Sequence, residues 1–149
     1  MIKTMATAKT NVIWKGNLTF EAEVNGFKFL MDTDESMGGN NRGPRPKPLL
    51  LAALSGCSGM DVASILEKMK VPPYQLQIDA EGDNSKNEPY IYENIRLIFN
   101  FTGDDLPKDK LIHAVELSVT KYCPVFAMLK KAANIKTFVN LNNEEIWNA

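Results

Sequence analysis

The chain has 149 residues, of which 44% are hydrophobic and 23% charged, and its formal net charge is −1. This composition is typical of a globular protein and excludes a disordered one, and the length fits a single domain over residues 1–149. Basic residues form no stripe, so we expect no nucleic-acid partner. Residues 1–10 lack the apolar segment of a signal peptide, and the longest apolar run, residues 49–54, is too short to span a bilayer. We therefore expect a cytoplasmic protein with no membrane partner.

Apolar and polar residues alternate over residues 18–24 and again over residues 27–31, with the dipeptide Asn25-Gly26 between the two runs. Asn-Gly is the strongest short signal for a β-hairpin, because both turn positions need a positive φ. A weaker pattern predicts another strand near residues 11–14. The three glycines and three prolines of residues 34–48 then indicate a long loop.

A helix is predicted over residues 49–70. Its first two turns are apolar on almost every side, which predicts burial all round, and its second half is amphipathic. Gly56 and Gly59 lie inside this helix, where each costs about 1 kcal/mol relative to alanine. We expect a second backbone or a ligand to approach the helix closely at these glycines.

Further along the chain, alternating patterns predict strands over residues 74–80 and 95–101, joined by a polar hairpin loop. Two helices are predicted, over about residues 107–122 and 124–133, and a strand over residues 135–141 closes the domain. Strands and helices occur in runs rather than in βαβ units. This order indicates an α+β fold with a mostly antiparallel sheet.

The two cysteines, Cys57 and Cys123, are the residues best suited to chemistry. Cys57 lies in the apolar helix, where a cysteine is more often a small core residue than a reactive one, although the neighbouring glycines leave room for a substrate. Cys123 precedes Pro124, so its thiol should lie at a break between two helices, near the N-cap of the second. Unpaired N–H groups there favour the nucleophilic thiolate. With His113 as the single histidine, we expect no metal site.

Two segments resemble the OsmC/Ohr family. Residues 43–62 (GPRPKPLLLAALSGCSGMDV) are similar to the central-helix signature of that family, and residues 114–129, which include KYCPV, are similar to its second cysteine block. The predicted order of strands and helices agrees over nearly the whole chain. The resemblance implies an OsmC-like fold, with an antiparallel sheet wrapped around two central helices in an intertwined homodimer.

The resemblance also implies an activity, because many members of the family reduce organic hydroperoxides with a pair of cysteines. Cys57 matches the peroxidatic thiol, which attacks the O–O bond and becomes a sulfenic acid. Cys123 matches the resolving thiol, which condenses with the sulfenic acid to a disulfide. The resemblance implies no cofactor, only an external thiol or dithiol that reduces this disulfide.

The chain departs from the family at the charges around the first cysteine. A glutamate normally precedes that cysteine by nine or ten residues, where this chain has Pro48 and Lys47. The family arginine often follows the first strand, where this chain has residues 15–17 (KGN). Arg45 is the candidate to replace it, because a guanidinium is always charged and offers several donors. The competing interpretation is that Arg45 is a solvated loop residue.

Two carboxylates near the cysteines have more than one interpretation. Asp61 lies one helical turn beyond Cys57, where its charge would raise the pKa of the thiol. We favour a simpler role for Asp61, a hydrogen bond between packed helices. Glu116, two turns before Cys123, is a speculative substitute for the missing glutamate.

These observations predict a homodimeric, thiol-dependent hydroperoxide reductase with Cys57, Cys123 and Arg45 as catalytic residues. The alternative is a non-enzymatic dimer of the same fold that binds a small apolar or thiol-containing molecule at the subunit interface, and the missing glutamate favours it. A purely structural dimer with two buried, unreactive cysteines is the third possibility.

Overall fold

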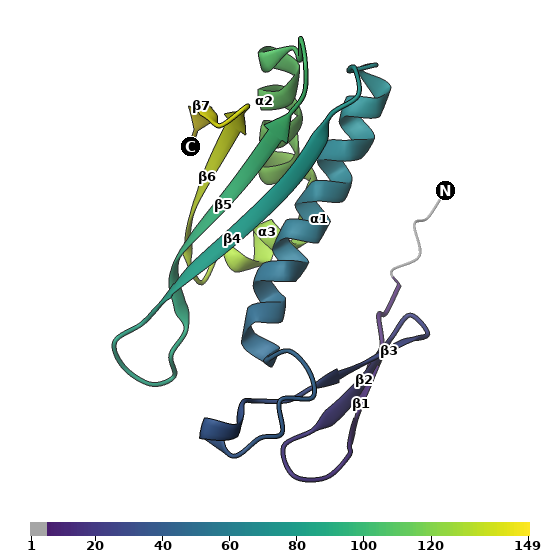
Figure 1. Cartoon of the computed structure of the whole chain (residues 1–149), viewed down its shortest axis with the longest axis vertical. Helices are drawn as coiled ribbons and strands as arrows, with labels where there is room; N and C mark the ends of the chain where they lie inside the picture. The colour runs from purple at the N-terminus through teal and green to yellow at the C-terminus, as the bar shows by residue number, and fades with distance from the viewer. Residues whose placement is uncertain (1–5) are drawn as a thin grey trace. The chain divides into compact units, whose positions relative to one another are not determined.

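The computed structural model describes residues 6–149, which form two compact units that meet in sequence between Leu50 and Leu51 (Figure 1). The first unit contains a three-stranded antiparallel sheet in the order β1 (Thr10–Trp14), β2 (Phe20–Val24) and β3 (Phe27–Met31). The predicted hairpin and the preceding strand are confirmed. Asn25 and Gly26 have φ angles of 51° and 84°, as the two-residue turn requires.

The loop that follows β3 is ordered by one buried carboxylate. Asp32 is 2% exposed and accepts a 2.8 Å hydrogen bond from the Thr19 hydroxyl. It also accepts hydrogen bonds from the backbone N–H groups of Thr33, Asn40 and Arg42. The loop contains one short 3-10 turn, η1 (Glu35–Met37). The predicted loop is therefore present, and it is tied down rather than free.

We expect the substitution Asp32→Asn to loosen this loop at neutral pH. Burial raises the pKa of Asp32, but the four hydrogen bonds outweigh it and hold the pKa below its ordinary value of 3.8. The carboxylate therefore contributes its full stability above about pH 4, and this stability is lost as the pH falls through the lowered pKa. Limited proteolysis should cut the variant faster within residues 33–43 at pH 7, with the difference shrinking near pH 3. Equal cleavage of Asp32→Asn and the exposed control Glu35→Gln would contradict this.

The long helix α1 spans Pro46–Lys68. It begins three residues earlier than predicted, because both Pro46 and Pro48 fit the first turn, where a missing N–H costs nothing. One stripe of the helix is buried and consists of Leu54, Ser58, Val62 and Leu66. The amphipathic second half of the helix is thus confirmed.

The prediction that the first turns of α1 are buried on every side is wrong for the single chain. Leu50 is 47% exposed and Met60 is 76% exposed, and Ala53 and Gly56 are also exposed. The reason is geometric, because the sheet of one chain covers only one side of a helix. By length and composition α1 could also cross a membrane, and 22% of its most apolar window is buried; the core helix of a soluble protein meets the same criterion.

The second unit contains a four-stranded sheet in the order β4-β5-β6-β7. Its strands are β4 (Gln75–Asn84), β5 (Tyr92–Thr102), β6 (Asn134–Leu141) and β7 (Glu144–Asn148). The β5–β6 pair is parallel and the other two pairs are antiparallel. The strands β4 and β5 are longer than predicted, and β6 is not the last strand. The sequence pattern missed β7 because its turn, Asn142-Asn143, reaches positive φ without a glycine.

The α+β fold class is confirmed. Figure 1 shows α1, α2 (Lys108–Leu117) and α3 (Pro124–Leu129) beside this sheet. On β5 the apolar residues from Ile95 to Phe101 are buried in the core at alternate positions, while Arg96 on the opposite face pairs with Glu81 and Asp83. The helices therefore cover the apolar face, and the other face is polar.

Candidate active site

Cys57 lies on the part of α1 that packs on the core. Its side chain is half-buried and contacts the buried cluster. The two glycines of this segment behave differently. A Cβ atom on Gly59 would lie 2.8 Å from the terminal methyl of the Ile78 side chain on β4, so a side chain rather than the predicted backbone or ligand approaches the helix there. A Cβ atom on Gly56 would meet nothing within 4 Å, so the close approach predicted at Gly56 is wrong for the single chain.

Cys123 is the N-cap of α3, as predicted. Its φ and ψ angles of −75° and 107° are extended, because Pro124 disfavours the α conformation in the preceding residue. The Cys123 sulfur accepts a hydrogen bond from the backbone N–H of Phe126 at 3.3 Å. Cys123 as a whole is 4% exposed. The proline thus stops one helix, starts the next, and leaves the thiol at the junction.

A π-helical turn, η2 (Ser118–Tyr122), joins α2 to this junction. The N–H of Cys123 bonds to the carbonyl of Ser118, five residues back, at 2.8 Å. A π-turn widens the helix by one residue and is frequent at functional sites. Here it sets the position of the second cysteine relative to α2.

The two thiols meet across the gap between α1 and α3. Both cysteines are free, and Cys57 is hydrogen-bonded to Cys123. The predicted approach of two thiols far apart in sequence is therefore confirmed. The backbone N–H of Val125, in the first turn of α3, also faces the Cys57 sulfur.

The surroundings of Cys57 disfavour its thiolate. Burial raises the pKa of Cys57 most, and the hydrogen bond with Cys123 raises it further, while the Val125 N–H lowers it. The negative charge of Asp61 adds to the increase in pKa. The net effect of these surroundings is a pKa of Cys57 above its ordinary value.

Two buried serines that the sequence analysis did not single out connect α1 to the cysteine junction. Ser58 and Ser118 are both fully buried. Ser58 donates a hydrogen bond to the Cys123 sulfur at 3.3 Å, and Ser118 donates to Asp61 Oδ2 at 3.0 Å. We call Ser58, Ser118 and Asp61 the serine bridge. The helix-packing role favoured for Asp61 is confirmed, and so is its effect on the pKa of Cys57.

The position of Ser58 next to Cys57, and of Ser118 in the second cysteine block, was the available signal for the serine bridge. Neither residue type stands out in a helix, because serine is common at solvated positions. Only the packing of α1 against η2 shows that both serines are buried, that the Ser58 hydroxyl contacts the Cys123 sulfur, and that the Ser118 hydroxyl contacts Asp61.

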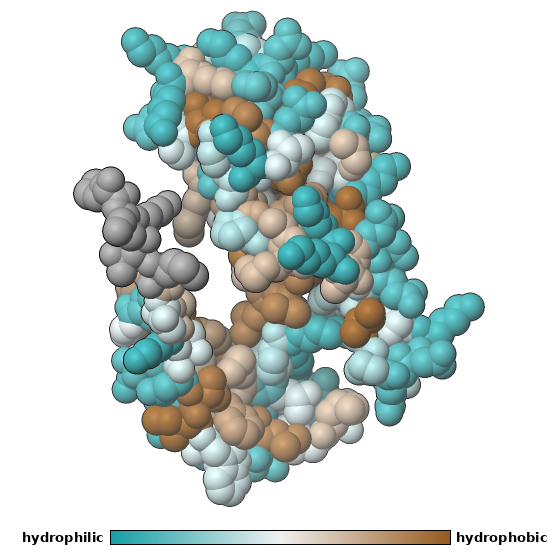
Figure 2. All heavy atoms as spheres, turned by 180° about the vertical axis from the view of Figure 1, so that it is seen from behind, coloured by the Kyte–Doolittle hydropathy of each residue, from teal (hydrophilic) through white to brown (hydrophobic). Residues whose placement is uncertain are grey.

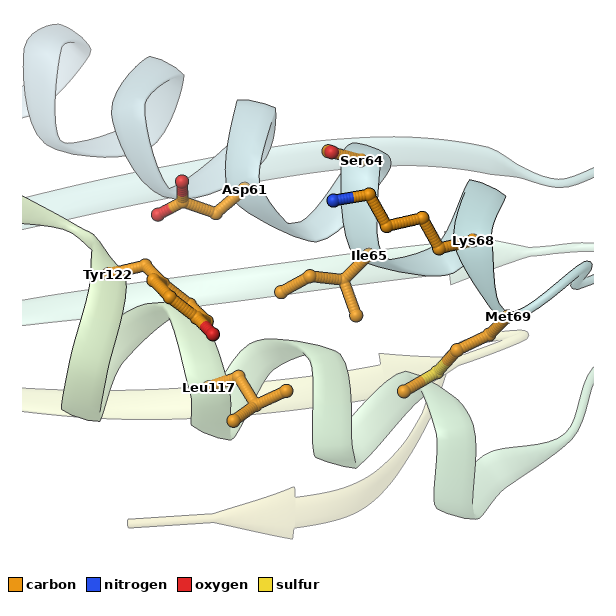
Figure 3. A pocket seen from close by; sticks show the side chains of 7 residues that line it. All are labelled: Asp61, Ser64, Ile65, Lys68, Met69, Leu117 and Tyr122. Atoms are coloured by element: carbon orange, nitrogen blue, oxygen red, sulfur yellow. The ribbon is translucent and has the colours of Figure 1, made fainter.

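A hollow of about 410 Å³ begins at Asp61 and runs along α1 (Figure 3). Figure 3 shows Asp61 and Tyr122 at one end and Lys68 and Met69 toward the other. Its remaining lining residues are Ser64, Ile65 and Leu117. The hollow combines an apolar floor with one carboxylate and one ammonium group.

A family model described as OsmC-like protein matches residues 38–138 of the chain. This chain belongs to the OsmC-like family. Protein YhfA of Escherichia coli K12 is 35% identical over 128 residues, which cover 85% of this chain and 92% of that relative. The OsmC-like fold predicted from the two cysteine blocks is therefore confirmed for the chain, and the homodimer stays a prediction.

Solved structures of the same architecture support the assignment. The crystal structure of a hypothetical protein from Aquifex aeolicus VF5 matches with a TM-score of 0.82 at 28% identity and covers 93% of this chain and 98% of that chain. An organic hydroperoxide resistance protein from Elizabethkingia anophelis matches with a TM-score of 0.70 at 16% identity, over 95% of this chain and all of that chain. At the lower identity the likeness shows the fold alone.

Arg45, the candidate for the OsmC-like arginine, lies in the first unit, whereas Cys57 lies in the second. Its guanidinium donates to Asn41 at 2.7 Å and to the Gly43 carbonyl at 3.2 Å, and it pairs with Asp34 at 3.6 Å. These contacts hold Arg45 within its own loop. Its catalytic role stays a prediction.

Glu116, the speculative substitute for the OsmC-like glutamate, lines a hollow with His113 and Trp147. Among residues 6–149, no group of three histidine, cysteine or acidic residues is close enough to bind a metal ion.

We expect Asp61→Asn to make Cys57 more reactive. The variant keeps an oxygen that accepts the Ser118 hydrogen bond but removes the charge that raises the pKa of Cys57. Alkylation of Cys57 by iodoacetamide at pH 7.5, followed by peptide mass spectrometry, should be about threefold faster than in the parent chain. Glu67→Gln, an exposed change on the same helix, is the control. An unchanged or slower rate in Asp61→Asn would remove Asp61 from the electrostatics of the thiol.

Proposed function

We propose that this protein reduces organic hydroperoxides with Cys57 and Cys123 and with an external thiol as reductant. The observation that carries the proposal is the contact between two free thiols, one on α1 and one at the N-cap of α3. Membership of the OsmC-like family supports the same chemistry. The free thiols also suit the reducing cytoplasm, which is the proposed location.

The proposed cycle has two halves. The Cys57 thiol first gives up its proton, and the thiolate attacks the O–O bond of the hydroperoxide. Cys57 becomes a sulfenic acid, and the departing alkoxide takes up a proton and leaves as an alcohol. Cys123 then attacks the Cys57 sulfur, water leaves, and a disulfide joins the two residues. Two external thiols restore the dithiol form and become a disulfide themselves.

The raised pKa of Cys57 means that the first step needs a cation beside the sulfur. We propose that Arg45 supplies this charge in the assembled protein, because the guanidinium stays protonated at every working pH. The glutamate found in other members is replaced by Pro48 or Lys47. Turnover should therefore be slow.

We also propose that the working form is a homodimer. In the first unit, Trp14 is 63% exposed and Phe27 is 77% exposed. In α1, Leu50 and Met60 are exposed as well. Apolar surface of this extent in both units fits an obligate interface, which resembles a protein core cut in half. Figure 2 shows brown apolar side chains on the surface of the molecule.

Serine substitutions should separate the two halves of the cycle. Cys57→Ser should abolish the consumption of cumene hydroperoxide, since no other thiol is matched to the first step. Cys123→Ser should allow one stoichiometric oxidation and then stop, because nothing captures the sulfenic acid before it oxidises further. Mass spectrometry should show added oxygen on the Cys57 peptide.

If the parent chain keeps all its free thiols under excess cumene hydroperoxide, the enzymatic proposal is wrong. A Cys123→Ser variant that turns over at the parent rate would instead overturn the resolving role alone.

Arg45→Ala should slow the oxidation of Cys57 by about ten- to a hundredfold, the effect of one charge-assisted contact of about 1.5–3 kcal/mol. The measurement is the second-order rate of thiol loss with cumene hydroperoxide. Arg42→Ala, in the same loop, is the matched control, because its described contact to Asp32 is made by backbone N–H. Equal rates in both variants would make Arg45 a solvated loop residue.

Sedimentation equilibrium at micromolar concentration should give twice the chain mass. The substitution Met60→Glu, on the exposed face of α1, should weaken that dimer by at least tenfold because it introduces a charge into an apolar interface. Glu67→Gln is the control. A folded monomer at these concentrations would contradict the shared interface.

A second function is favoured by two specific observations. The missing glutamate and the raised pKa of Cys57 suit a protein that binds rather than reduces, and the hollow beside Asp61 has room for a small apolar or thiol-containing molecule. Such a protein would consume no peroxide in any variant and would keep its ligand affinity in both serine variants.

A further inference from the structure

The two sulfurs of the thiol pair have unequal surroundings. Cys123 is 4% exposed, whereas Cys57 is only half-buried. Once a disulfide joins them, an external thiol can attack either sulfur, and the other sulfur leaves. The direction of that step depends on access to the attacked sulfur and on stabilisation of the leaving one.

The Cys123 sulfur accepts two hydrogen bonds, one of them from a buried hydroxyl, whereas the Cys57 sulfur faces the backbone N–H of Val125. The two bonds to Cys123 come from the fully buried Ser58 hydroxyl and from the Phe126 N–H, both at 3.3 Å. Donors of this kind stabilise a developing thiolate more than a neutral sulfur. The Ser58 hydroxyl lies on α1, beside Cys57, so it is in place when the disulfide between the two residues breaks.

We infer that the reducing thiol attacks the Cys57 sulfur and that Cys123 leaves as a thiolate, which accepts a hydrogen bond from the Ser58 hydroxyl. This inference rests on the proposed function. In this step the attacking thiolate forms a bond to Cys57, the bond between Cys57 and Cys123 breaks, and its electron pair goes to Cys123. The product is a mixed disulfide on Cys57. A second external thiol then attacks the sulfur of the bound reductant, and Cys57 leaves and takes up a proton.

Ser58 is therefore a catalytic residue for the reductive half of the cycle, because its hydroxyl contacts the leaving sulfur. Ser55 lies one turn away on α1, but its hydroxyl bonds to the Leu51 carbonyl of the same helix at 3.0 Å. The two serines form a matched pair, one facing the thiols and one satisfied within its own helix.

The experiment starts from protein oxidised with diamide, so that formation of the disulfide does not depend on peroxide. Glutathione is added, the reaction is quenched early with N-ethylmaleimide at acidic pH, and the cysteine peptides are mapped by mass spectrometry. We expect glutathione on Cys57 and N-ethylmaleimide on Cys123. Glutathione on Cys123, or a disulfide that diamide cannot form or glutathione cannot open, would overturn the inference.

Ser58→Ala should slow this exchange by about tenfold and lower the share of glutathione found on Cys57. Ser58→Thr keeps the hydroxyl and should restore both the rate and the share, and Ser55→Ala should change neither. A purely structural defect in Ser58→Ala would slow attack at both sulfurs and leave the fraction of glutathione on Cys57 unchanged. That result would also overturn the role of Ser58. Failure of the parent chain to consume peroxide, with this exchange pattern intact, would overturn the proposed function alone.

Discussion

The serine bridge and the two thiols form one polar cluster at which α1 meets the junction of η2 and α3, inside a core that is otherwise apolar. Every member of this cluster depends on its neighbour. Pro124 creates the helix break, the break exposes the Cys123 sulfur to the Phe126 N–H, and Ser58 approaches the same sulfur from α1. Removing a donor from a buried cluster leaves its partner unsatisfied, which costs about 1–3 kcal/mol. This cost explains how short polar side chains hold a long helix in one register.

The close approach of α1 to β4 makes this cluster possible. Gly59 lets the helix lie against Ile78, whose terminal methyl would have to move to make room for a larger residue. A helix held further from the sheet would also be further from η2, and Ser58 and Ser118 could not bridge to their partners. The destabilising effect of a glycine inside a helix, about 1 kcal/mol, is offset by this packing.

The electrostatics of the thiol pair differ from those of a single activated cysteine. Cys57 is surrounded by influences that raise its pKa, and its nearest carboxylate, Asp61, is bound to a serine rather than to a cation. The proposed reaction with peroxide therefore depends on a cation that the contacts of Cys57 within the second unit do not include. The exposed apolar residues of α1 and of the first sheet support the proposed homodimer, because large uncovered apolar surface is typical of an interface.

Local patterns in the sequence were sufficient to predict the hairpin at Asn25-Gly26, the long helix, the helix break at Pro124 and the α+β fold class. Each depends on φ preferences or on periodicity, which act over a few neighbouring residues. The family resemblance identified the two cysteines but not the serine bridge. Strand β7 and the exposure of α1 were also beyond local patterns. These features depend on which surfaces meet after folding. Burial of a hydroxyl, or its contact with a sulfur 65 residues away in sequence, is decided by tertiary packing, because the same serine would be solvated if α1 were rotated about its axis.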